Sequence, residues 1–139
     1  MTRALKTLSA VAILAALFLP LATCRDAHGV RTAMSLADGS AGGVPSAAFF
    51  VWPVVFVAIE LLAPWPRFVR VLIAIEPILA VVTAAVLWWA LACVGLMSFG
   101  GEVEVGAGAY LAEVGLAGYF CASAVENFAV LRRRKAHAI

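Results

Sequence analysis

Four long apolar stretches constrain this chain more than any other feature of its sequence. They cover roughly residues 4–23, 46–63, 68–97 and 106–131. A helix needs about 20 apolar residues to cross a hydrocarbon core about 30 Å thick, and each stretch comes close to that length or exceeds it. We therefore expect each of the four to be a transmembrane helix.

The composition supports a membrane location. Hydrophobic residues make up 65% of the 139 residues and charged residues 13%, whereas soluble domains are roughly half apolar and about a quarter charged. A soluble fold of this length has too little interior to bury so many apolar side chains. The sequence thus predicts an all-α integral membrane protein, a four-transmembrane-helix bundle that forms a single membrane domain over residues 1–139.

The connections between the spans are mostly short. Residues 24–45 form the longest polar segment, which we expect to be an outer loop, and the motifs PWPRF and SFGGEVEVG join the later spans. Short connections predict that the second, third and fourth helices are antiparallel neighbours.

The positive charges predict the orientation. If the N-terminus is cytoplasmic, eight of the ten lysines and arginines lie on the inner side and only Arg25 and Arg31 lie outside. This distribution fits the positive-inside rule and puts both termini in the cytoplasm. The expected location is the cell membrane, multi-pass, as in a bacterial inner membrane. The eight inner residues are Arg3, Lys6, Arg67, Arg70, Arg132, Arg133, Arg134 and Lys135.

The segment LFLPLATC at residues 17–24 allows two interpretations. Its last four residues resemble the lipobox Leu-Ala-(Gly/Ala)-Cys, which implies a processed lipoprotein-type chain lipidated at Cys24. Alternatively, Pro20 ends the regular hydrogen bonding of a retained first helix near the outer surface. We expect the retained helix, because cleavage would remove one span and leave a chain that three others already anchor.

Three carboxylates within the spans are the most informative polar residues. Glu60, Glu76 and Glu126 each lie roughly 6 to 9 Å from the cytoplasmic end of their helix, at about 1.5 Å per residue. The sequence therefore predicts one layer of carboxylates from three helices. Glu126 shares its helix face with Tyr119 and with a stripe of small residues suited to helix packing, Gly108, Ala112, Gly115 and Ala122.

Two hypotheses explain this layer. In the first, Glu60, Glu76 and Glu126 bind a proton or cation, as intramembrane carboxylates do in transporters. In the second, the carboxylates are structural, and the arginines at 67 and 70 and the basic cluster 132–135 neutralise them by reaching back from the headgroup boundary. The second hypothesis needs fewer assumptions.

Several other polar or special residues lie within the spans. Glu113 lies on the opposite side of its helix from Glu126, near the outer surface. Asn127 is placed to hydrogen-bond across helices. Pro53 and Pro77 each remove an intrahelical hydrogen bond from their helix.

Motifs that would indicate a reaction are absent from the sequence. It contains no C-x-x-C pair, no Cys/His spacing for zinc and no phosphate-binding loop. Cys24 and Cys93 would both lie near the outer surface, so a disulfide between them is geometrically possible. We expect no metal, no cofactor and no nucleic-acid partner, and an enzyme is the less favoured class.

The sequence favours a non-enzymatic accessory or structural component that acts through helix packing in the lipid bilayer, as a homo-oligomer or within a larger membrane complex. The alternative is a small oligomeric proton- or cation-coupled transporter or channel that uses the carboxylate layer.

Overall fold

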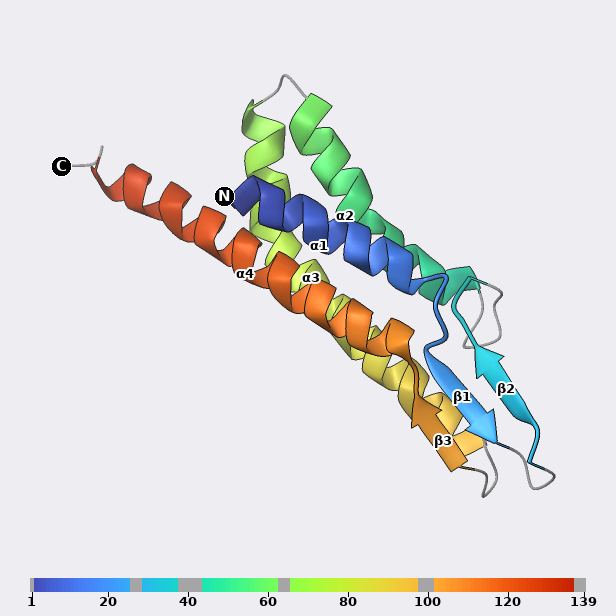
Figure 1. The fold of residues 1–139 in the computed structure, drawn as a ribbon. Helices are drawn as coiled ribbons and strands as arrows, with labels where there is room; N and C mark the ends of the chain where they lie inside the picture. The colour runs from blue at the N-terminus through green and yellow to red at the C-terminus, as the bar shows by residue number, and fades with distance from the viewer. Residues whose placement is uncertain (1, 26–28, 38–43, 63–65, 98–101, 137–139) are drawn as a thin grey trace.

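The computed structural model describes residues 2–25, 29–37, 44–62, 66–97 and 102–136, with side chains at most of these positions. The described chain is mostly helical and contains a small sheet (Figure 1). The elements in chain order are α1 (Thr2–Ala16), β1 (Ala22–Arg25), β2 (Arg31–Met34), α2 (Val44–Leu62), α3 (Pro66–Met97), β3 (Glu102–Val105) and α4 (Ala107–Ala136).

Two of the described helices are long and apolar enough to cross a membrane. These segments are Val71–Leu96 in α3 and Ala107–Val130 in α4. The apolar part of α2, Ala48–Leu62, is shorter. A bundle of four membrane spans therefore stays a proposal.

Helix α1 ends earlier than the sequence analysis predicted, at Ala16 instead of near residue 23. The N–H groups of Leu17, Phe18 and Leu19 bond to carbonyls three residues back, at 3.2, 3.1 and 3.3 Å. Such bonds tighten the last turn, and Pro20 then has no N–H with which to continue it. The chain leaves the helix here and becomes extended at β1.

The three-stranded sheet corrects the expectation of plain loops between the spans. Its order is β2-β1-β3, with both pairs antiparallel, and Cys24 lies opposite Thr32 on one side and Val103 on the other. Figure 1 shows the sheet at the end of the bundle away from the two termini. The alternating Glu-Val-Glu-Val of β3 is a strand pattern that was readable in the sequence.

Small residues of α4 allow α1 to pack closely against it. A Cβ added at Gly115 would lie 2.8 Å from Cγ1 of Ile13, and one at Gly108 would lie 2.7 Å from the Leu19 carbonyl oxygen. Ala112 and Ala122, on the same stripe, are buried. The stripe predicted for helix packing thus faces α1 of the same chain.

Each proline inside a helix leaves the backbone carbonyl four residues earlier without its helical donor. In both cases a polar side chain of a neighbouring helix lies beside that carbonyl. Pro53 leaves the carbonyl of Phe49 without its usual donor, and Thr83 Oγ1 lies 3.2 Å from that oxygen. Pro77 does the same to Ile73, whose oxygen accepts a 2.7 Å hydrogen bond from Asn127 Nδ2. Asn127 thus satisfies the carbonyl that Pro77 frees, whereas the single hydroxyl proton of Thr83 is shared between the Phe49 carbonyl and the Leu79 carbonyl, which is 2.8 Å away.

Candidate functional site

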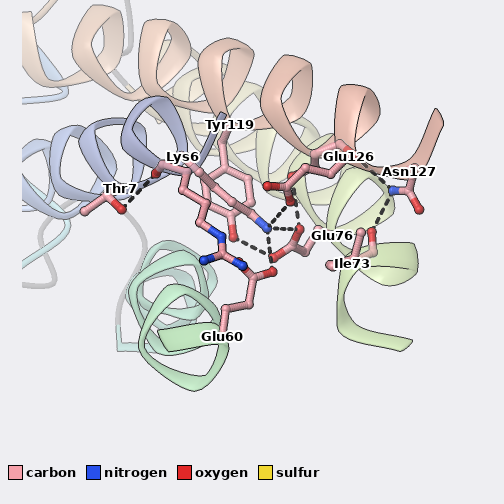
Figure 2. A network of polar contacts seen from close by, with 10 residues as sticks. Lys6, Thr7, Glu60, Ile73, Glu76, Tyr119, Glu126 and Asn127 are labelled. Atoms are coloured by element: carbon pink, nitrogen blue, oxygen red, sulfur yellow. Dashed lines mark hydrogen bonds and ion pairs between the residues drawn. The ribbon is translucent and has the colours of Figure 1, made fainter. Parts of the chain in front are cut away.

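One charged side chain from each of the four described helices meets at a single point in the bundle (Figure 2). Nζ of Lys6 in α1 lies 2.6 Å from Glu60 Oε1 in α2 and 2.6 Å from Glu76 Oε2 in α3. It lies 3.1 Å from Glu126 Oε2 in α4. We call these four residues the Lys6 cluster.

Helix geometry predicted the three carboxylates in one layer, and the structure brings their oxygens within 4.8 Å of one another. Lys6 was not predicted among them, because a basic residue near an N-terminus is usually an orientation signal. The helical spacing of α1 could have indicated that Lys6 is buried. Lys6 shares a face with Ser9, Ala10 and Ile13, all buried, which is the spacing of a core-facing stripe.

Glu76 is the best compensated of the three carboxylates. Its side chain is 0% exposed. Besides the ion pair with Lys6, it accepts hydrogen bonds from Tyr119 Oη at 2.9 Å and Ser123 Oγ at 3.1 Å. Such partners satisfy the lone pairs of a buried charge, so Glu76 has the most complete set of partners in the cluster.

Glu60 and Glu126 lie at the edges of the cluster. Their side chains are 13% and 16% exposed, against 1% for Lys6. A small pocket of about 10 Å³, lined in part by Arg3, Lys6 and Glu60, leads to the cluster, and that volume is about what one water molecule needs. Exchange with solvent is therefore open at Glu60, whereas Glu76 is enclosed.

The cluster has more acidic groups than basic ones. Three carboxylates surround one ammonium, so two negative charges lack a partner if every group is ionised. Arg3 lines the adjoining pocket, but the ion pairs of the described residues join only Lys6 to these carboxylates. Like charges this close and this buried are costly, so the arrangement favours binding of further positive charge.

Asn127 connects the cluster to the proline in α3. Its amide donates to the carbonyl of Ile73, four residues before Pro77, and also to the carbonyl of Ser123 at 3.1 Å. Glu76 directly precedes that proline, and Ser123 donates to Glu76. The segment of α4 from Tyr119 to Asn127 therefore holds the Glu76 carboxylate in place and also bonds to α3 where Pro77 interrupts its hydrogen bonding.

The arginines predicted to neutralise the carboxylates do not do so where the structure describes them. Arg132 is exposed, and Lys6 takes that role. The side chains of the other four, Arg67, Arg70, Arg133 and Arg134, and that of Lys135 lie outside the described residues.

Cys24 and Cys93 are free thiols. Cys24 is part of the central strand β1, so the segment predicted as a helix end forms sheet instead. The possible disulfide is therefore not formed in the structure.

The chemistry available to the cluster is proton exchange between carboxylates around a fixed ammonium. A metal ion would compete for the place that Nζ already occupies, within 3.1 Å of all three carboxylates. Protons need no such displacement. Comparison with protein-family models, characterised proteins and solved structures found no match to this chain, so its function has to be argued from the Lys6 cluster itself.

Proposed function

We propose that this chain is a small multi-pass membrane protein whose Lys6 cluster binds and releases protons along a proton pathway across the membrane. The observation that carries the proposal is the charge imbalance, with three carboxylates within 3.1 Å of one ammonium. Glu76 is the permanent partner of Lys6. Glu60 and Glu126, which are partly exposed, take up and give off the protons.

The proposal includes four membrane crossings with both termini in the cytoplasm. The termini lie at one end of the bundle and the sheet at the other (Figure 1). Helix α1 has 15 residues, about 22 Å, and the extended residues that follow it supply the remaining length. The inner location of most basic residues supports this orientation in a cell membrane.

Retention of α1 is part of the proposal. Cleavage before Cys24, as in the lipoprotein hypothesis, would remove Lys6 and leave three buried carboxylates without their ammonium. It would also remove Ala22 and Thr23 from the central strand, which pairs with both β2 and β3.

An accessory role in a larger complex is the second candidate. Each described helix contributes one member of the cluster, and this favours the accessory role. Ion pairs that join all four helices are expected of a contact that stabilises the bundle. Under this hypothesis, Lys6 holds the bundle together and no proton moves.

Proton flux into proteoliposomes distinguishes the two candidates. We expect the intact protein to collapse an imposed pH gradient when a potassium ionophore balances charge, and Glu126→Gln to abolish the flux without changing the thermal unfolding temperature. Glu104→Gln in β3 is the matched control, since it removes a carboxylate from the sheet and should leave the flux unchanged. Absence of flux in the intact protein, or equal flux in Glu126→Gln, would leave the accessory role.

A further inference from the structure

A groove between α3 and α4 lies apart from the Lys6 cluster. Its volume is about 290 Å³, and its lining is mostly apolar. The small side chains of Ala80, Ala84 and Ala117 leave the space, and Trp88 and Phe120 contribute aromatic rings to it. Trp88 is 63% exposed and Phe120 41%, so the groove is open to the surroundings of the bundle.

Glu113 is the charged residue among those that line this groove. It is half-buried, and among the described residues no hydrogen bond or ion pair joins it to another group. Its position is about 9 Å along α4 from Ala107. An unpaired carboxylate at membrane depth is costly, so it marks a place where a positive charge is favoured.

A second copy of this chain is a poor source of that charge. The described basic side chains other than Lys6 are Arg3, Arg25, Arg31 and Arg132, which lie near helix ends or in the strands. Lys6 is enclosed in its own cluster. From its described residues, a copy would therefore bring apolar surface but no cation to the depth of Glu113.

We propose that this groove binds a lipophilic organic cation. The carboxylate of Glu113 supplies the opposite charge, the rings of Trp88 and Phe120 supply faces that attract cations, and the alanines accommodate an apolar body. Entry from the hydrocarbon phase needs no opening of the bundle, since the groove is open on that side. The proposal rests on Glu113 and not on the proton-binding role of the Lys6 cluster.

Binding of tetraphenylphosphonium to the detergent-solubilised full chain tests this site by calorimetry and by quenching of tryptophan fluorescence. We expect saturable binding that Glu113→Gln weakens by about tenfold or more, since it removes one charge contact. Glu113→Asp should retain most of it. The matched control Glu104→Gln, which removes a carboxylate outside the groove, should bind as the intact protein does, and so should Glu126→Gln.

Tetraphenylborate has the same shape and the opposite charge, so it separates charge from apolar attraction. We expect Glu113→Gln to bind this anion more tightly than the intact protein does. Equal binding of tetraphenylphosphonium by the intact protein and Glu113→Gln, with circular dichroism showing both folded, would overturn the proposal. Failure of the intact protein to bind the cation at all would also overturn it and would favour a partner helix in the groove.

Discussion

Glu76 and Glu113 are both carboxylates within the helices, yet their surroundings are opposite. Glu76 is fully buried and has Lys6, Tyr119 and Ser123 as partners. Glu113 is half-buried in an apolar groove, where no described residue pairs with it. A glutamate in an apolar span therefore does not always indicate the same role. A compensated carboxylate stabilises the bundle, whereas an uncompensated one favours a ligand from outside.

Removal of the cluster's ammonium should have the largest effect. Lys6→Met leaves three neighbouring carboxylates without their ammonium, and breaking a buried ion pair typically costs about 3 to 5 kcal/mol. We expect a loss of that size in the free energy of unfolding, measured by denaturant titration in detergent. Arg3→Met, at an exposed position of the same helix, should change it by less than about 0.5 kcal/mol. Similar losses in the two variants would contradict the role of Lys6.

The close contact between α1 and α4 gives the next effect. Gly115→Ala places a Cβ 2.8 Å from Ile13 Cγ1, and overpacking of this kind costs about 1 to 3 kcal/mol. Gly95→Ala is the matched control, because a Cβ there meets no atom within 4 Å, and alanine is the better helix former. The two variants should therefore shift the unfolding midpoint in opposite directions. Equal shifts would show that the contact is not tight.

The bond from Asn127 to the Ile73 carbonyl should contribute less. Asn127→Ala leaves that carbonyl without a donor, which we expect to cost about 1 kcal/mol. In a Pro77→Ala background the backbone N–H of residue 77 can serve the same carbonyl, so the cost should shrink. A double-mutant cycle on unfolding free energies measures this coupling. An undiminished effect in the alanine background would mean that Asn127 acts elsewhere.

The smallest expected effect is that of Glu113→Gln, and Glu76→Gln is the variant with which we compare it. Glu76→Gln weakens the buried ion pair and should destabilise the protein. Glu113→Gln removes a charge that has no described partner, so the unfolding free energy should stay within about 0.5 kcal/mol of the original or rise slightly. Thermal unfolding of both variants in the same detergent gives the comparison. Destabilisation of equal size would mean that Glu113 has a structural partner after all.

Part of this arrangement was predictable because helix geometry relates sequence distance to depth. Counting residues from the helix ends placed Glu60, Glu76 and Glu126 in one layer, and helical phase put Gly108 and Gly115 on the face of α4 that now contacts α1. Neither inference needed knowledge of how the chain folds back on itself. The proton-binding role of the layer stays a proposal.

The rest depended on contacts between distant segments. Lys6 was read as an orientation signal, although its spacing with Ser9 and Ile13 marks the buried face of α1. The sheet joins three short strands, and β1 and β3 are separated by two long helices. The alternation in β3 is readable, but β1 and β2 carry a weak signal in an apolar chain, and only the folded bundle brings the three strands together.

The infrared spectrum of the carboxyl groups measures proton binding at the Lys6 cluster itself, because protonated and ionised carboxyls absorb at separate frequencies. Because three carboxyls surround one ammonium, we expect protonated carboxyl bands from the Lys6 cluster at neutral pH, and we expect Glu60→Gln to remove one of them. The Glu104→Gln control, which alters the sheet, should leave these bands in place. A spectrum in which Glu60, Glu76 and Glu126 are all ionised at neutral pH would contradict the proposed proton-binding role of the Lys6 cluster.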